Sequence, residues 1–160
     1  MTVYVHLATG FEELEALSPV DVLRRGGVDV KTVSVMDEHT VIGSHGIPVV
    51  ADLMFEEANY DECDMIVLPG GMPGTKNLEA HEGLMSHVDA FHESQKYLAA
   101  ICAAPSVFGK YGFLEGRNAT AYPGFEEVQY KEFLSASILR HHPSYQPMQR
   151  YSKYHAGPLF

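Results

Sequence analysis

The fold is decided by residues 2–36, TVYVHLATGFEELEALSPVDVLRRGGVDVKTVSVM, in which two apolar stretches flank an amphipathic one. Residues 2–8 and 28–36 are rich in β-branched side chains and are bounded by glycines, which predicts two strands. Between them, residues 13–25 repeat Leu and Val at three- and four-residue spacing, which predicts a helix. A strand, a helix and a strand in this order form a βαβ unit, which implies parallel strands joined by a right-handed crossover.

The alternation of strands and helices continues beyond this unit. Residues 41–42 and 47–50 are separated by GSHG and predict a small hairpin, and residues 65–68 predict a short buried strand. Residues 83–97 place apolar side chains on one face of a predicted helix, and residues 97–101 predict another buried strand. The pattern places the chain in the open α/β class, with a mostly parallel central sheet and helices on both of its faces.

The composition of the chain restricts its size class and its partners. Its 160 residues, 46% of them hydrophobic, suffice for one globular domain whose core needs no disulfide or metal. The longest apolar runs are far shorter than the ~20 residues of a membrane-spanning helix, so we expect no membrane partner. The formal net charge of −10 repels phosphate backbones, which disfavours nucleic-acid partners.

Two further features concern the location of the protein and the end of its domain. The N-terminal residues lack the basic start of a signal or transit peptide, so we expect a cytoplasmic protein with two free thiols. Residues 1–128 hold 7 basic and 20 acidic side chains, whereas residues 129–160 hold 4 and 1. The strand and helix alternation also ends there, and only one short helix, around residues 132–140, is predicted beyond it. We expect an α/β domain over residues 1–127 and a divergent, irregular tail over residues 128–160.

Cys102 is the most informative residue for chemistry. It follows the predicted strand at residues 97–101, where AAPS turns the chain into a helix. Ligands of open α/β sheets bind beyond the carboxyl ends of the strands, and a thiol there lies near backbone N–H groups and a helix N-terminus, which favour the thiolate. The arrangement resembles a nucleophile elbow, although a cysteine that merely fills a strand end explains the residue equally well.

Two other strand exits supply polar groups to the same edge of the sheet. The loop at residues 69–74, PGGMPG, is either an ordinary tight exit or a place where a backbone N–H acts as an oxyanion donor. It has neither GxGxxG nor GK[ST], which excludes dinucleotide-binding and P-loop sites. The first exit brings together Glu12, Glu13 and Glu15, and a buried carboxyl there can keep its proton and hydrogen-bond a thiolate. Complementing a helix N-terminus explains Glu12 and Glu13 better, and leaves Glu15 open.

The histidines and the second cysteine give no metal signature. No HExxH pattern and no Cys/His zinc spacing occurs in the sequence, so no metal or cofactor is predicted. We expect His81, His87 and His92 to be solvated on a surface helix. Cys63 stands at the start of a predicted strand, and we expect it to be structural.

The three strand exits together resemble the ThiJ/PfpI family, the group that includes the Parkinson-linked protein deglycase and redox chaperone, and in particular its bacterial-type members. The similar stretches are GFEELEALSPVDVLRRGGVDV, MIVLPGGMPGTKNL and AAICAAPSVFGKYGFLEGRNATAYPGFEE, and the resemblance extends over residues 2–127. It implies a flavodoxin-like α/β sandwich related to class I glutamine amidotransferases, without cofactor or metal.

The resemblance also implies roles for individual residues. It makes Cys102 the reactive cysteine and Glu15 the protonated carboxyl that hydrogen-bonds the thiolate. It makes Gly71 and Ala103 the backbone donors of an oxyanion site. Members similar to this chain are usually homodimers with the site close to the interface, and Arg25 matches a family position near that interface.

The chain departs from the family pattern at two places. Tyr122 stands where related members have a histidine; a phenol, with an ordinary pKa of about 10, can donate a hydrogen bond but is a poor general base, which disfavours peptidase-type Cys–His chemistry. The sequence after Glu127 lacks the family's glycine-containing strand, SRGPGT-like loop and closing apolar helix. We expect a truncated, frame-shifted or substituted end that leaves one sheet edge and part of the core uncovered.

Two functions are consistent with these residues. In the first, which we favour, Cys102 attacks small reactive carbonyls such as methylglyoxal, or glycated groups; this is the glyoxalase III or deglycase activity that the family implies, a hydro-lyase or hydrolase with a cysteine nucleophile. In the second, Cys102 oxidises to a sulfinate and the protein is a redox sensor or chaperone in oxidative stress, without turnover. Similar proteins are often labelled thiazole monophosphate biosynthesis proteins, a step that nothing in these residues explains.

Overall fold

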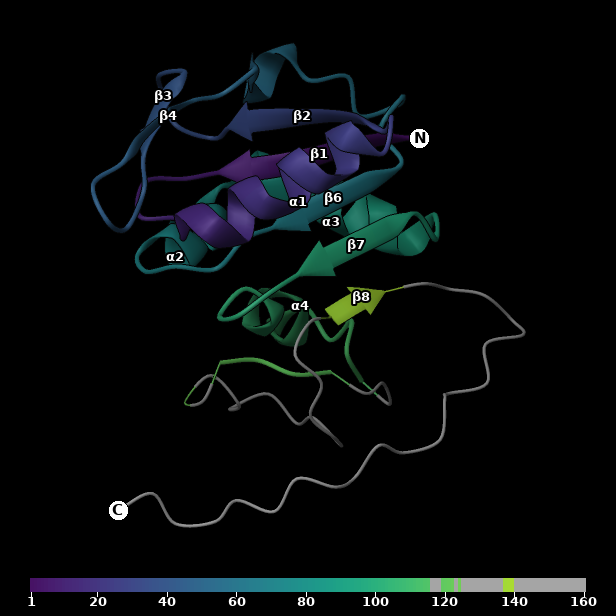
Figure 1. The fold of residues 1–160 in the computed structure, drawn as a ribbon. Helices are drawn as coiled ribbons and strands as arrows, with labels where there is room; N and C mark the ends of the chain where they lie inside the picture. The colour runs from purple at the N-terminus through teal and green to yellow at the C-terminus, as the bar shows by residue number, and fades with distance from the viewer. Residues whose placement is uncertain (116–118, 123, 125–136, 140–160) are drawn as a thin grey trace, which may run out of the picture.

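The predicted βαβ unit opens the structure, a computed structural model that describes residues 1–115, 119–122, 124 and 137–139 (Figure 1). β1 (Thr2–Leu7) and β2 (Asp29–Ser34) are parallel and are joined by α1 (Glu13–Arg25). The later elements, in chain order, are β3 (Thr40–Ile42), β4 (Pro48–Val50), β5 (Leu53–Met54), the short 3₁₀ helix η1 (Phe55–Glu57), β6 (Met65–Leu68), α2 (Gly74–Ala80), α3 (Glu82–Glu93), β7 (Tyr97–Ala100), α4 (Pro105–Lys110) and β8 (Ser137–Leu139).

A six-stranded sheet in the order β5-β2-β1-β6-β7-β8 forms the middle layer. All neighbouring pairs are parallel except β7 with β8. The order of the central strands, β2-β1-β6-β7, is that of flavodoxin-like folds, which confirms the predicted fold class. The order reverses between β1 and β6, because β2 lies on one side of β1 whereas β6 and β7 lie on the other. Ligands of such sheets bind at this switch point, beyond the carboxyl ends of the strands.

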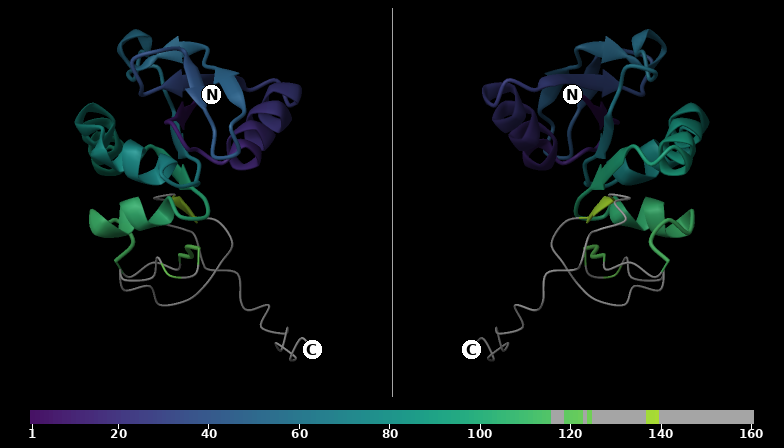
Figure 2. Two further views of the ribbon diagram at one scale, coloured as in Figure 1. Left: turned by 90° about the vertical axis from the view of Figure 1, so that its left-hand side faces the viewer. Right: turned by 90° about the vertical axis from the view of Figure 1, so that its right-hand side faces the viewer.

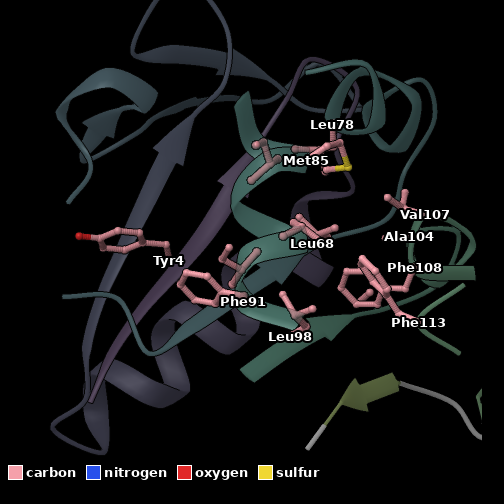
Figure 3. Packing of buried hydrophobic residues seen from close by; sticks show 14 of the residues in the cluster. Tyr4, Leu68, Leu78, Met85, Phe91, Leu98, Ala104, Val107, Phe108 and Phe113 are labelled. Atoms are coloured by element: carbon pink, nitrogen blue, oxygen red, sulfur yellow. The ribbon is translucent and has the colours of Figure 1, made fainter. Parts of the chain in front are cut away.

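Helices cover both faces of the sheet, with α1 on one face and α2 and α3 on the other (Figure 2). Side chains of β1 alternate between the two faces, as those of any strand do. Val5 packs in the cluster that contains Val20 of α1, whereas Tyr4 belongs to the cluster of α3 and α4. Figure 3 shows this second cluster, in which Phe91 and Phe108 approach the sheet. Among the helices of the described ranges, none has the length and apolar character needed to cross a membrane.

Most of the predicted elements are confirmed, including the hairpin of β3 and β4. The largest differences are one additional helix and one helix that ends early. α2 was not predicted; it begins at Gly74, inside the stretch that is rich in glycine and proline, and Pro73 is its N-cap. α3 ends at Glu93 instead of continuing to residue 97, because Gln95 adopts a left-handed conformation with φ of 60° that ends a helix.

The tail falls mostly outside the described residues. Ser137–Leu139 form β8, which pairs antiparallel with β7, so the helix expected around residues 132–140 is wrong for these three residues. The outer edge of β7 offers unpaired N–H and C=O groups, and a strand satisfies them where a helix cannot. We expected the tail to leave one sheet edge uncovered, but β8 covers the outer edge of β7. The other residues of the predicted helix, and the remainder of residues 128–160 apart from β8, lie outside the described residues.

Candidate active site

Three strand exits meet at the switch point of the sheet. The exit of β1 leads into α1, the exit of β6 carries Gly70, and the exit of β7 carries Cys102. Because β1, β6 and β7 are parallel neighbours, their carboxyl ends lie at the same edge. Backbone hydrogen bonds join the exits: the N–H of Glu12 donates to the carbonyl of Gly70 at 3.0 Å, and the N–H of Ile101 donates to that of Leu68 at 3.3 Å.

Cys102 occupies a turn with an unfavourable backbone conformation. Its φ is 59°, in the left-handed region that residues with a side chain rarely adopt. α4 begins shortly afterwards with Pro105 as its first residue, so Cys102 lies between a strand and a helix in the manner of a nucleophile elbow. The residue is only partly buried. The turn therefore holds the thiol in one place without enclosing it.

The Glu15 carboxyl lies against this thiol. It forms a side-chain hydrogen bond with Cys102 and accepts the backbone N–H of Gly70 at 2.9 Å. A Cβ atom added to Gly70 would lie 2.5 Å from Oε2 of Glu15 and 2.7 Å from Cβ of Cys102. Only a glycine fits between the two residues. The structure thus brings together the thiol and the carboxyl that the sequence analysis singled out.

Burial and charge determine how the Glu15–Cys102 pair binds protons. Burial raises the pKa of the Glu15 carboxyl, hydrogen bonds from Cys102 and Gly70 lower it, and the charge of Glu12 raises it. Burial also raises the pKa of the Cys102 thiol, as do the charge and the hydrogen bond of Glu15. Since the pKa of each group is raised overall, the pair holds protons more tightly than two separate groups in water would.

From the sequence we expected the turn to favour the thiolate, and this holds only in part. The backbone N–H groups of Ala103 and Gly71 do lower the pKa of Cys102, but burial and Glu15 outweigh them. α4 has only six residues, so its dipole adds little. The thiolate therefore depends on a proton that resides on Glu15, which removes the repulsion between the two groups.

The backbone N–H groups of Gly71 and Ala103 lie near the Cys102 thiol, since both lower its pKa. Their role as the donors of an oxyanion site stays a prediction. Gly71 has a φ of 91°, and a Cβ atom there would collide with the backbone of Glu12 and Gly10, so the close approach of this loop requires glycine. Two N–H donors directed at one point also stabilise negative charge on an oxygen that develops beside the sulfur.

The turn of the β3–β4 hairpin closes over Glu13, a contact that the sequence analysis missed. The Glu13 side chain is almost fully buried and accepts hydrogen bonds from the backbone N–H of His45 at 2.8 Å and from the hydroxyl of Ser44 at 3.2 Å. Nδ1 of His45 lies 2.7 Å from the same carboxylate. Burial raises the pKa of Glu13, but the bonds from His45 outweigh it and hold the pKa at about 2. The hydrogen bond that His45 donates to the Glu13 carboxylate raises the pKa of His45.

Glu12, Glu13 and His45 are also the group of described residues that comes closest to a metal site. Their candidate ligand atoms all lie within 4.8 Å of one another. The expectation that Glu12 complements the helix N-terminus is confirmed, since its carboxylate accepts the N–H of Glu15 at 2.8 Å as the N-cap of α1. Glu13 does not cap the helix; its carboxylate instead accepts hydrogen bonds from Ser44 and His45 in the hairpin turn. These hydrogen bonds account for the proximity of the three side chains.

Tyr122 contacts the backbone of Cys102, whereas Arg25 lies at the far end of α1. The N–H of Tyr122 donates to the carbonyl of Cys102 at 2.7 Å, while its side chain is exposed. Arg25 is the last residue of α1, at the end opposite Glu15, and its Nε donates to Asp21 at 2.9 Å. The structure does not bring Arg25 to the thiol of its own chain. Its place near a dimer interface stays a prediction.

The histidines of α3 and its N-cap are less solvated than we expected, since His81, His87 and His92 are only partly exposed. His87 stacks on Tyr60 with ring centroids 3.7 Å apart, and His92 stacks on Phe113 at 4.1 Å, because aromatic side chains from outside α3 cover them. His6 is fully buried in β1 and shares a 2.8 Å hydrogen bond with the Tyr60 hydroxyl. Periodicity within one helix carried no signal for these contacts.

Cys63 behaves as the structural cysteine that was expected. It is fully buried, and its thiol donates to the carbonyl of Met65 at 3.2 Å. Burial raises its pKa to about 11, whereas Cys102 is partly accessible and hydrogen-bonded to a carboxyl. Both cysteines are free thiols.

Together these features define an open α/β protein of flavodoxin-like topology, with a cysteine in a strand–turn–helix at the switch point of its sheet. The model of the DJ-1/PfpI family matches residues 1–136. The chain belongs to the DJ-1/PfpI family, which is the family that the three strand exits resemble.

Relatives and solved structures of the family show how much of a whole member this chain represents. Protein DJ-1 homolog A of Arabidopsis thaliana is 42% identical over 127 residues, which cover 79% of this chain and 32% of that protein. Deglycase PfpI of Pyrococcus furiosus is 32% identical over 120 residues, which cover 75% of this chain and 71% of that protein. The structure of oxidized Toxoplasma gondii DJ-1 is 38% identical with a TM-score of 0.75, and the match covers 80% of this chain and 70% of that one. The chain thus spans about a third of the Arabidopsis relative.

Proposed function

We propose that the protein catalyses a cofactor-independent reaction in which Cys102 attacks a small reactive carbonyl, a glyoxalase III-like or deglycase-like activity. One observation carries the proposal: the Glu15 carboxyl lies against the Cys102 side chain with only Gly70 between them, and the backbone N–H groups of Gly71 and Ala103 lower the pKa of the same thiol. A relative named as a deglycase, from Pyrococcus furiosus, supports the same class of reaction. The substrates are small aldehydes such as methylglyoxal, or glycated groups.

The first step uses the shared proton of the Glu15–Cys102 pair. With that proton on Glu15, the sulfur is a thiolate, which adds to the aldehyde carbon and forms a carbon–sulfur bond. The carbonyl π electrons move to oxygen, and the N–H groups of Gly71 and Ala103 stabilise the alkoxide. Glu15 then donates its proton to the alkoxide, which gives a hemithioacetal and a carboxylate.

The second step needs no oxidant for a 2-oxoaldehyde. The Glu15 carboxylate removes the proton from the carbon that bears sulfur, and the electron pair shifts toward the ketone oxygen to give an enediol; that oxygen takes up the proton that the hemithioacetal hydroxyl loses. Glu15 then returns its proton to the neighbouring carbon, so that the product is a 2-hydroxy thioester. The aldehyde carbon is oxidised and the ketone carbon is reduced by the same two electrons. Water then hydrolyses the thioester, which releases the hydroxy acid and restores the thiol.

Lactate formation from methylglyoxal tests this proposal directly. We expect turnover by the wild-type protein, loss of turnover to background in Cys102→Ser, and unchanged turnover in Cys63→Ala, which removes the buried thiol. The Cys63 variant controls for unspecific addition of thiols to the aldehyde. Equal rates for the wild type and Cys102→Ser would remove Cys102 from the mechanism and overturn the proposal.

Redox sensing at the same cysteine is a second candidate function. A thiolate reacts with peroxide to give a sulfenate and water, and a second peroxide gives the sulfinate. The donors that would hold an alkoxide, Gly71, Ala103 and protonated Glu15, would also hold sulfinate oxygens. Intact-mass analysis during peroxide titration separates the two functions. A gain of two oxygen atoms at Cys102 without carbonyl turnover would favour sensing.

We further propose that the protein acts as a homodimer that uses the outer face of α1. Leu14 and Val22 support this, since they are 73% and 65% exposed on that helix, more than large apolar side chains usually are. Arg25 lies on the same helix, as expected for a residue near the interface. Light scattering after size-exclusion chromatography should give twice the chain mass for the wild type and a lower mass for Leu14→Glu. A monomeric wild type would refute the dimer.

A further inference from the structure

A closed circuit of three hydrogen bonds joins Glu12, Glu15 and Gly70. The backbone N–H of Glu12 donates to the carbonyl of Gly70 at 3.0 Å, and the N–H of Gly70 donates to the Glu15 carboxyl at 2.9 Å. The circuit closes through the N–H of Glu15, which donates to Oε2 of Glu12 at 2.8 Å. Each residue donates one bond and accepts one. The circuit therefore fixes the first turn of α1 against the exit of β6, and with it the carboxyl that touches the thiol.

Glu12 brings a negative charge to this circuit as well as a hydrogen-bond acceptor. Its backbone is extended, as an N-cap requires, and its side chain is 23% exposed, so water screens the charge only in part. The charge raises the pKa of Glu15. A serine or an asparagine would cap a helix as well as Glu12 does, but without a charge. Capping alone therefore does not explain why a carboxylate stands here.

The charge of Glu12 affects whether the shared proton lies on Cys102 or on Glu15, because it changes the energy of the Glu15 carboxylate. With the proton on Cys102, the Glu15 carboxylate lies close to the Glu12 carboxylate, and the two repel each other. With the proton on Glu15, the negative charge resides on sulfur, beside the N–H groups of Gly71 and Ala103. Repulsion between carboxylates thus disfavours the first placement and favours the second.

We propose that Glu12 is a positioning residue for the chemistry of Cys102: its carboxylate holds the backbone of Glu15, and its charge keeps the shared proton on Glu15 instead of sulfur. The inference deepens the proposed function and rests on it, since that reaction starts from a Cys102 thiolate. Glu12 itself does not touch the sulfur in this scheme. It acts through Glu15.

Other charged groups near the pair modify this effect. From α1, Glu13 faces away from the pair, with its carboxylate bound by Ser44 and His45 of the hairpin. From the hairpin, Nδ1 of His45 lies 4.0 Å from Oε1 of Glu12, so a protonated His45 partly neutralises the Glu12 charge. We therefore expect the influence of Glu12 on Glu15 to strengthen as the pH rises and His45 loses its proton.

Alkylation of Cys102 by iodoacetamide tests the proposal without requiring turnover. The rate constant is measured from pH 5 to 9 in a Cys63→Ala background, in which only Cys102 reports. Glu12→Gln keeps the acceptor for the Glu15 N–H and removes the charge, and we expect it to slow alkylation at pH 7 by about 3- to 10-fold. Glu12→Asp keeps both the charge and the cap, and should restore most of the rate.

A double variant separates the charge effect from a general loss of structure. In Glu15→Gln no carboxyl competes for the proton, so adding Glu12→Gln should change the rate by less than about twofold. An unchanged rate in Glu12→Gln alone, or an equal loss in Glu12→Gln and Glu12→Asp, would overturn the inference. Methylglyoxal turnover is measured on the same samples. Absence of turnover with an intact alkylation pattern would refute the proposed function and leave the role of Glu12 standing.

Discussion

The backbone N–H of Gly70 lies 2.9 Å from the Glu15 carboxyl, although 55 positions separate the two residues in the chain. The carboxyl that touches the Cys102 thiol is therefore held by the exit of a different strand. The contact depends on the register of β1 against β6, in which Val5 pairs with Val67. We therefore expect chemistry at the sulfur to respond to backbone changes at Gly70, even though this residue has no side chain.

Gly70→Ala should therefore damage both stability and thiol reactivity. The new Cβ would lie 2.5 Å from Oε2 of Glu15 and 2.7 Å from Cβ of Cys102, so the carboxyl must move away. We expect a loss of about 1–3 kcal/mol in the free energy of unfolding, measured in urea, and a changed rate of Cys102 alkylation. Gly46→Ala is the control, because a Cβ there meets nothing within 4 Å and only its φ of 76° is strained. An alkylation rate that Gly70→Ala leaves unchanged would show that the contact is unimportant.

Glu15→Gln should convert a coupled titration into a simple one. Gln keeps an acceptor for the Gly70 N–H but does not titrate, so the alkylation rate of Cys102 should follow one ionisation instead of two coupled ones. Carbonyl turnover should fall by about 10²- to 10⁴-fold, because an amide cannot transfer the proton. Glu93→Gln, at the exposed end of α3, should alter neither measurement. Two steps in the Glu15→Gln profile would disprove the coupling.

His45 should make stability fall as the pH rises above 6.5. Its pKa is raised by the hydrogen bond that it donates to the Glu13 carboxylate, so its contribution to stability is complete below the ordinary pKa of 6.5 and is lost as the pH rises through the folded value. Glu13 stays ionised throughout, because its pKa is about 2. The midpoint of thermal unfolding should differ more between wild type and His45→Gln at pH 6 than at pH 9. A difference that does not change with pH would mean that the ion pair adds nothing.

His6 should make the protein sensitive to acid. Burial lowers its pKa to about 3, so the folded state keeps it neutral while the unfolded state binds a proton below pH 6.5. Stability is thus lost as the pH falls from 6.5 towards 3, by up to about 1.4 kcal/mol per pH unit. His6→Gln keeps a polar partner for Tyr60 and should be less stable at pH 7, but with a shallower decline between pH 6.5 and 4.5 in urea unfolding. Parallel declines would exclude His6 as the cause.

Much of the fold is readable from local pattern, because most of its elements are formed by residues that are close in sequence. Residues 13–25 and 65–68 are confirmed at both ends, since their apolar spacing and glycine borders leave few alternatives. α2 could not be predicted from local pattern, because contacts with distant residues fix its start at Gly74. Pro73 is its N-cap, and the carbonyl of Gly10 accepts the Gly74 N–H at 3.1 Å. Contacts of this kind override the low helix propensity of the segment.

Site residues could be predicted from the sequence where the position after one strand was enough to identify them. Contacts between segments that are far apart in the sequence could not be predicted. Cys102 stands out because it follows a strand directly in an open α/β pattern, whereas the role of Glu15 was predicted only from the resemblance to the family. The clamp of Glu13 by His45 depends on a hairpin about thirty residues away, and its only sequence signal was the GSHG turn, in which Gly43 leaves room for the carboxylate. The raised pKa of Cys102 depends on burial, which no spacing of residues reports.

The ring of bonds through Glu12, Glu15 and Gly70 has a consequence for the nascent chain. Its members belong to segments that meet only when the strands β1 and β6 have paired. Before that moment Cys102 and Cys63 are equivalent thiols with the ordinary pKa of cysteine. Only the paired strands make them different, because one becomes fully buried and the other comes to lie against a carboxyl.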